Sequence, residues 1–349
     1  MAENLTPREM VKGLLQGVSP PRPLILPIVF SLGAEVENLP LGTFLGSPTK
    51  ISNSLRQMHN RLGSDGVACY FDPYLEAEAL GGTLHWEKEG QWARICWPRQ
   101  TAKGQLPEGL RSPEEASKSS RVAVAVEVIR QLKWLLRDRT LLMAAATGPF
   151  TLAARITHLE HEEELHSEDL PEAALELAAS VIHKVALAFV EAGANLVLVR
   201  EEILPTLSAE SCQAWASLLA PAFNVVRFYE ALPVLVLANE HSVAKNCDVI
   251  FREPWGRVLC PALDALRAFP PGRIPELKAA TVGLALPLKA FQPDEPAREE
   301  LDPFLPQVIS ELQPAILTTA GDLPTGTDMK RVMRIFLRCA KTRVEKRIC

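Results

Sequence analysis

The fold is decided by the stretch DGVACYFDPYLEAEALGG, residues 65–82, together with TGPFTLAARI, residues 147–156. Each stretch follows or contains a short apolar run, typical of a buried strand, that leads into a polar turn. The first turn holds Asp72, Glu76 and Glu78, and the second holds a Gly-Pro pair beside the Thr147 hydroxyl. In barrels of parallel strands the chemistry lies at the C-terminal strand ends. The two stretches therefore predict such a barrel and place its site at these ends.

Eight apolar runs have the length of strands, and most are apolar on both faces, as in parallel sheets covered on both sides. They are residues 24–30, 66–71, 140–146, 195–200, 233–238, 247–251, 281–288 and 314–319. Helical patterns cover residues 47–63, 113–137, 171–194 and 328–344. This alternation predicts an α/β fold, a (β/α)8 TIM barrel that forms a single domain over residues 1–349. Residues 82–97 read as a β-hairpin inserted after the second strand.

Composition and charge exclude several classes of protein. Hydrophobic residues make up 47% of the 349 residues, and the net charge is −5, without the basic stripe of a nucleic-acid binder. We find no apolar run near the roughly 18 residues of a membrane span and no signal core at the N-terminus. The seven cysteines form no C-x-x-C pair, which argues against a zinc knuckle or a disulfide framework. We expect a cytoplasmic protein without nucleic-acid or membrane partners.

The chain resembles the uroporphyrinogen decarboxylase superfamily, which also contains the corrinoid-dependent methyltransferases. The resemblance is carried by DGVACYFDPYLEAEALGG (65–82), ATGPFTLAARI (146–156), AFVEAGANLVLVREE (188–202) and ILTTAGDLPTGTD (316–328). In addition, TPREMVKGLLQG (6–17) looks like the N-terminal helical extension of that superfamily. The resemblance implies a TIM barrel that binds a tetrapyrrole or corrinoid ligand. Decarboxylases of this superfamily are similar to dimers, so a homodimer is one expected oligomeric state.

The decarboxylase branch of this superfamily implies a cofactor-free enzyme. In that branch an aspartate after the second strand faces the pyrrole nitrogens of the substrate, and Asp72 matches its position. The branch also has an arginine-rich segment after its first strand, which holds the substrate carboxylates. Here that segment is FSLGAEVENLPLG (30–42), which has no arginine and carries Glu35 and Glu37. Two acids repel a polycarboxylate, so this segment argues against the usual substrate.

The methyltransferase branch implies a corrinoid, carried in some members by a corrinoid protein, and a zinc ion that binds a thiol. The run EAEALG (76–81) matches this branch. Its zinc ligands, however, fall on Leu237, Asn239 and Gly321, none of which is a zinc ligand of that set. The nearby His241 and Cys247 have no familiar zinc spacing. We therefore expect zinc to be absent and assign no metal ligand.

The candidate site residues follow the predicted strands. Those expected to act in catalysis are three carboxylates and an imidazole: Asp72, Glu78, Glu201 and His241. Those expected to bind substrate are Glu35, Thr147, Phe150, Asn239 and Asp322. In this hypothesis Asp72 orients or protonates a heterocycle, and the turn that holds His241 offers an acid–base group and an amide.

Several candidates also have a structural interpretation. Asp-Pro is a common helix entry, so Asp72 equally fits a helix N-cap. Glu76 and Glu78 are two apart, so only one of them faces the mouth of the barrel if they are helical, and the other is solvated. Glu201 equally fits a rim charge or an ion pair. The histidines of ARITHLEHEEELHSEDL (154–170) fit a solvated helix or a lid better than a metal site, because their spacing spreads them around a helix.

Two hypotheses of function follow. The first is a zinc-independent enzyme that acts on a tetrapyrrole or corrinoid ligand, by porphyrinogen decarboxylation or by corrinoid-linked methyl transfer. Decarboxylation requires Arg22, Arg155 or Arg200 to replace the missing carboxylate clamp, and methyl transfer requires a base such as Glu240 or His241. The second hypothesis is a non-catalytic barrel that binds a small ligand or a corrinoid protein.

Overall fold

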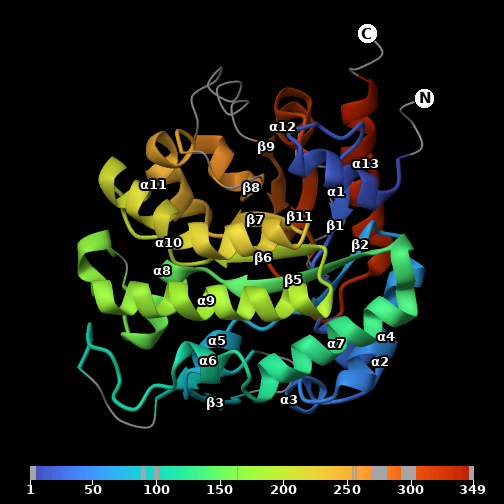
Figure 1. Ribbon diagram of the computed structural model, residues 1–349. Helices are drawn as coiled ribbons and strands as arrows, with labels where there is room; N and C mark the ends of the chain where they lie inside the picture. Colours follow the sequence, from blue (N-terminus) through green and yellow to red (C-terminus); the bar gives the residue numbers. More distant parts are fainter. Residues whose placement is uncertain are drawn as a thin grey trace.

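The protein has a TIM-barrel-like α/β fold (Figure 1). It is described here by a computed structural model that covers residues 5–87, 92–97, 102–162, 164–253, 255, 258–268, 281–291 and 304–345. The parallel strands are β1 (Leu24–Leu26), β2 (Gly66–Tyr70), β5 (Leu141–Thr147), β6 (Leu196–Glu201), β7 (Leu232–Leu237), β8 (Val258–Pro261), β9 (Thr281–Val282), β10 (Leu284–Leu286) and β11 (Ile316–Thr319).

These strands lie beside one another in the order of the chain. One parallel sheet runs β2-β5-β6-β7-β8-β9 and the other runs β10-β11-β1. Only Gly283 separates β9 from β10, and a side chain there would run into the Cys260 sulfur and lie 3.1 Å from the Ile316 carbonyl. At the other junction the Asp65 N–H donates to the Ile25 carbonyl at 3.0 Å, just before β2 begins. The C-terminal ends of β2, β5 and β6 therefore meet at one end of the barrel.

Helices lie along the outside of the strands and at their ends. They are α1 (Pro7–Leu15), α2 (Leu32–Val36), α3 (Leu41–Phe44), α4 (Pro48–Leu62), α5 (Leu75–Ala79), α6 (Pro113–Ala116), α7 (Ser120–Leu136), α8 (Pro149–Ile156), α9 (Glu172–Ala192), α10 (Ala209–Phe228), α11 (Glu240–Ile250), α12 (Phe304–Leu312) and α13 (Met329–Glu345). Their ends carry the expected signals: α1 begins with a Thr6–Glu9 capping box, and α4 ends at Gly63 with φ 66°. Figure 1 shows α9 lying along the outside of β5 and β6.

Three sequence-based expectations need correction. Residues 247–251 are not the sixth strand, since α11 extends to Ile250, and β8 takes that place in the sheet. The helix expected over residues 113–137 is divided at Ser117–Ser119 into α6 and α7. The expected seventh strand consists of the short β9 and β10. The hairpin after β2 is confirmed by the antiparallel β3 (Thr83–His85) and β4 (Arg94–Cys96).

Helix α9 corrects the expectation that no segment is apolar enough to span a membrane. By length and composition alone this helix of 21 residues meets that test. Half of its most apolar window is buried inside the protein, where the helix packs between α8, α10 and strands β5 and β6. A core helix of a globular domain passes the same test, so α9 is weak evidence for a membrane span.

Candidate functional site

A narrow pocket opens at the C-terminal ends of β2, β5 and β6. Its free volume is about 10 Å³, on the order of a single water molecule. The lining residues come from the three strand ends and from α8: Phe71, Asp72, Pro73, Ala145, Ala146, Thr147, Arg155, Arg200 and Glu202. The two stretches that decided the fold therefore meet at this pocket. Four of the lining residues are charged: Asp72, Arg155, Arg200 and Glu202.

Asp72 is held between a backbone amide and an arginine. Its side chain is only 1% exposed, and it forms an ion pair with Arg121 from α7. One of its oxygens also accepts a hydrogen bond from the Tyr74 N–H at 2.9 Å, which fixes the turn after β2. Burial raises the pKa of Asp72, and the Arg121 charge opposes this rise. Arg121 also binds Glu78 at 2.5 Å, so the two predicted catalytic carboxylates share one guanidinium group.

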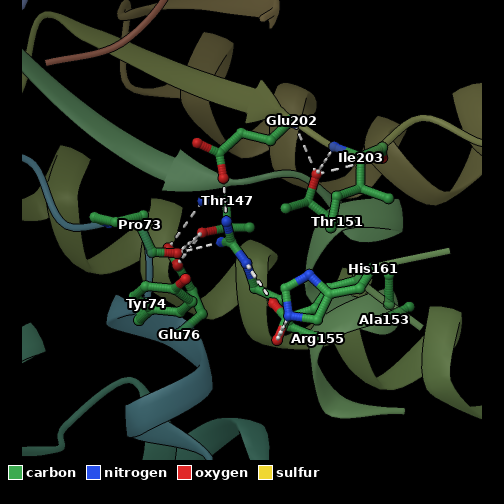
Figure 2. A network of polar contacts seen from close by, with 12 residues as sticks. Pro73, Tyr74, Glu76, Thr147, Thr151, Ala153, Arg155, His161, Glu202 and Ile203 are labelled. Atoms are coloured by element: carbon green, nitrogen blue, oxygen red, sulfur yellow. Dashed lines mark hydrogen bonds and ion pairs between the residues drawn. The ribbon is translucent and has the colours of Figure 1, made fainter. Parts of the chain in front are cut away.

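Two further arginines converge on Glu202, which follows β6 directly. Arg155 from α8 and Arg200 from β6 each form an ion pair with this carboxylate, one on each oxygen. Arg155 also donates to the Pro73 carbonyl and stacks on the Tyr74 ring, 4.7 Å from its centroid. Figure 2 shows Arg155 between Pro73 and Glu202. Burial alone would raise the pKa of Glu202, but the two guanidinium groups lower it to about 2.

Glu76 lies beneath the pocket and is fully buried. Its carboxyl group accepts hydrogen bonds from the Thr147 hydroxyl at 2.7 Å and from the Thr147 N–H at 3.2 Å. Burial raises the pKa of Glu76 to about 7. The two carboxylates thus differ, as expected: Glu76 is buried and holds the end of β5, while the Glu78 side chain is 26% exposed and binds Arg121. Thr147 reaches the pocket as a lining residue whose hydroxyl is directed at Glu76.

Glu201 caps the N-terminus of α8. Its carboxyl group accepts hydrogen bonds from the Phe150 N–H at 3.0 Å, the Thr151 N–H at 2.9 Å and the Thr151 hydroxyl at 2.5 Å. It is 1% exposed, and burial raises its pKa to about 7. The Phe150 ring points away from the pocket lining and packs on Trp215, with ring centroids 5.2 Å apart. Glu201 and Phe150 therefore do not line the pocket. They hold α8 in position, and α8 carries Arg155.

The remaining candidates lie outside the pocket lining. Asp322 is buried after β11 and accepts hydrogen bonds from the Phe30 and Ser31 N–H groups at 2.7 and 3.0 Å. Burial raises the pKa of Asp322 to about 6. Glu35 is exposed and accepts from the Gly326 N–H at 2.9 Å. Both carboxylates tie the loop after β1 to the loop after β11, on another part of the barrel mouth from Arg155.

Asn239 and His241 stand at the start of α11, after β7. The Asn239 side chain accepts hydrogen bonds from the His241 and Ser242 N–H groups at 3.0 and 3.1 Å, as a helix N-cap does. His241 is exposed, and neither residue lines the pocket. The histidine-rich segment is not a helix: His158 has φ 59°, and His161 and its neighbours form turns. In this segment the half-buried Glu160 lies 3.8 Å from the Nε of Arg155.

The residues present do not fit the zinc site of the methyltransferase branch. Leu237 ends the buried strand β7, and Asn239 caps α11. Gly321 lies against Arg200, so that a side chain at position 321 would lie 3.1 Å from the guanidinium group. An arginine in this place also repels a cation. Among the described residues no group of three or more His, Cys, Asp or Glu side chains is arranged to hold a metal ion.

Arg155 and Arg200, two of the arginines predicted to replace the carboxylate clamp, both line the pocket. Arg22 does not, because it binds Asp65 at 2.6 and 2.7 Å before β2, at the opposite strand ends. Arg121 was missed. In the sequence Arg121 is a single arginine at the start of an apolar helix, which by itself does not indicate a site. Its partner Asp72 lies 49 positions earlier in the chain.

Comparisons with known proteins agree with the fold. The family model described as Uroporphyrinogen decarboxylase (URO-D) matches residues 6–223, more than half of the chain. Among solved structures, a methyltransferase from Methanosarcina mazei superimposes with a TM-score of 0.73 at 16% identity, over 98% of this chain and 99% of that chain. A B12-independent methionine synthase from Shewanella sp. W3-18-1 gives a TM-score of 0.51 at 12% identity, over 85% and 88%. No curated protein matches the chain. At such identities the structural likeness bears on the fold alone.

Proposed function

The chain belongs to the uroporphyrinogen decarboxylase family, as a divergent member, and on this premise we propose that it decarboxylates a carboxylate-bearing tetrapyrrole, without zinc, at the pocket over β2, β5 and β6. The observation that carries the proposal is the meeting of Asp72, Arg155 and Arg200 in one pocket. In this proposal the chain is a single cytoplasmic domain that acts on a small molecule.

The proposed roles follow from the chemistry of these groups. A buried carboxylate stabilises positive charge on a pyrrole ring that gains a proton before CO₂ leaves, and it does so best in a site of low polarity. Asp72 has the burial that this role requires. Guanidinium groups bind carboxylates through two parallel hydrogen bonds, which suits Arg155 and Arg200 to the acidic side chains of a porphyrinogen. The free volume of the pocket, about that of one water molecule, is far too small for a macrocycle, which would lie above it.

Corrinoid-linked methyl transfer, the other reaction of the superfamily, receives less support from the site. It requires an activated acceptor, and His241 stands outside the pocket lining while zinc ligands are replaced by Leu237, Asn239 and Gly321. The binding of a corrinoid or a corrinoid protein remains the runner-up proposal for this barrel.

One observation favours a second function, that of a non-catalytic barrel which binds an anionic ligand. The charged groups that line the pocket already have partners: Asp72 pairs with Arg121 from α7, and Glu202 pairs with Arg155 and Arg200. A carboxylate whose charge is already balanced by a guanidinium group stabilises a cationic pyrrole ring less than an unpaired carboxylate does.

The test is anaerobic incubation of the protein with uroporphyrinogen, followed by chromatography of the products. Stepwise loss of carboxylates by the wild type, and loss of this activity in Asp72→Asn, is the expected result. The matched control is Asp138→Asn, which changes an aspartate that is 87% exposed and lies before β5. An inactive wild-type protein that still binds the substrate favours the non-catalytic function. Equal rates for wild type and Asp72→Asn overturn the role of Asp72.

A further inference from the structure

We propose that Arg155 and Arg200 form the site for a ligand carboxylate, and that Glu202 is an internal competitor which fills this site in the present structure. This inference rests on the proposed function in so far as the same pocket receives the substrate. It adds the side chain that occupies the two arginines and must leave before a ligand carboxylate binds them. The Glu202 carboxylate stands in for the carboxylate of the ligand.

Both arginines are positioned by groups other than Glu202. The Arg200 Nε donates to the Ala320 carbonyl at 2.7 Å, and its guanidinium group lies 5.5 Å from the centroid of the Phe71 ring. Arg155 is fixed by the Pro73 carbonyl and the Tyr74 ring. Removal of the Glu202 carboxylate therefore leaves two guanidinium groups in place, and a preorganised site of this kind loses little conformational entropy on binding.

Glu202 can leave by side-chain rotation alone. Its backbone N–H donates to the Thr151 hydroxyl at 2.9 Å, and the next N–H, of Ile203, donates to the same hydroxyl at 3.1 Å. Its side chain is 28% exposed, whereas that of Arg155 is 6% exposed. The Glu202 side chain thus borders solvent, and the hydrogen bonds that hold its backbone do not involve its carboxylate.

Arg155 also has a donor that Glu202 does not satisfy. Its Nε is buried and has no hydrogen-bond partner among the described residues. The nearest acid, Glu160, lies 3.8 Å away, beyond hydrogen-bonding distance. A buried donor without a partner destabilises the arrangement that leaves it unpaired. A ligand carboxylate that is free to choose its angle of approach can satisfy this donor, which a side chain tethered at position 202 does not.

The test uses glutarate as the probe, titrated by calorimetry at constant ionic strength. In Glu202→Gln the competitor is removed, and glutarate is expected to bind about tenfold more tightly than to the wild type, because a tethered group competes at a high effective concentration. Arg200→Gln added to Glu202→Gln should abolish the gain. The matched control, Glu114→Gln, removes a charge from an exposed ion pair with Lys184 and should leave glutarate affinity unchanged.

Glu202→Asp provides a second variant, which keeps the charge and shortens its reach, and should bind glutarate with intermediate affinity. Equal affinity in wild type and Glu202→Gln, or a gain that survives Arg200→Gln, overturns the inference. The outcome separates it from the proposed function. Tighter glutarate binding without turnover of uroporphyrinogen supports the carboxylate site and refutes the decarboxylase. Turnover with unchanged glutarate affinity refutes the carboxylate site alone.

Discussion

Gly148→Ala tests the cap that fixes the wall of the pocket. Gly148 precedes α8 with φ −77° and ψ 161°, a conformation that alanine adopts without strain. The obstacle is Glu201, because a Cβ at position 148 would lie 2.5 Å from both carboxyl oxygens and closer still to the carbon between them. The buried Glu201 must therefore move, and its hydrogen bonds to Phe150 and Thr151 must lengthen or break.

The magnitude follows from two opposing effects. Glu201 makes three hydrogen bonds to the first turn of α8. Loss of two of them, at about 2 kcal/mol each for a partly charged acceptor, costs about 4 kcal/mol. The alanine restricts the unfolded chain and returns about 0.5–1 kcal/mol. We expect a net loss of about 3 kcal/mol in the free energy of unfolding.

The assay is urea unfolding at pH 7, followed by far-UV circular dichroism. Gly13→Ala is the matched control, since Gly13 lies inside α1 and a Cβ there would meet Val18 at 3.7 Å, an ordinary contact. This control should stabilise the protein by about 0.5–1 kcal/mol.

A double-mutant cycle identifies the cause. Once Glu201→Ala has removed the obstacle, the further change Gly148→Ala should cost almost nothing, which gives a coupling of about 3 kcal/mol. Additive losses in the cycle, or a Gly148→Ala protein as stable as the wild type, would refute the proposed role of Glu201 as the cap of α8.

Three further predictions concern the charged groups. Burial raises the pKa of Glu76 to about 7, so its contribution to stability is complete below pH 4.5 and is lost as the pH rises through 7. Glu76→Gln should flatten the dependence of the free energy of unfolding on pH between 5 and 8, by about 3 kcal/mol in total, as measured by urea unfolding at each pH. Arg121→Met should destabilise the protein by about 3 kcal/mol at pH 7, because it leaves Asp72 buried without its partner charge, and Asp72→Asn should restore part of the loss in urea unfolding. Asp65→Asn should cost about 2 kcal/mol through the paired bonds to Arg22, while calorimetry should show unchanged glutarate binding because this pair lies at the opposite strand ends.

The sequence predicted the fold wherever an apolar run was followed by a strong turn signal. The run that ends in Asp72-Pro73 and the run that ends in Gly148-Pro149 mark β2 and β5. Residues 247–251 were wrongly predicted to be a strand because the apolar end of a helix and a short buried strand have the same composition. The true strand, β8, has only four residues, and its neighbours in the sheet decide its conformation.

The candidate site was harder to predict because its partners are distant in the sequence. Asp72 was recognised from its place after a strand, but the arginine that binds it comes from α7. The same limit applies to Glu76 and Glu78, which look equivalent in the run EAEALG. The structure buries Glu76 against Thr147 and leaves Glu78 on the rim, since the direction of the short α5 depends on tertiary packing.

The positions of the arginines bear on how an anionic ligand would orient. The loop after β1 has no arginine, and its Glu35 is engaged by the Gly326 N–H. Arg22 is tied to Asp65 away from the pocket. Arg155 and Arg200 are thus the guanidinium groups that line the pocket, on the side of α8 and β6. Opposite charges attract strongly in a poorly solvated pocket, so the carboxylate of a ligand should lie over β5 and β6 and away from the acids of the β1 loop. If the protein decarboxylates porphyrinogens, its substrate is therefore held from a different side of the barrel than in relatives whose arginines follow the first strand.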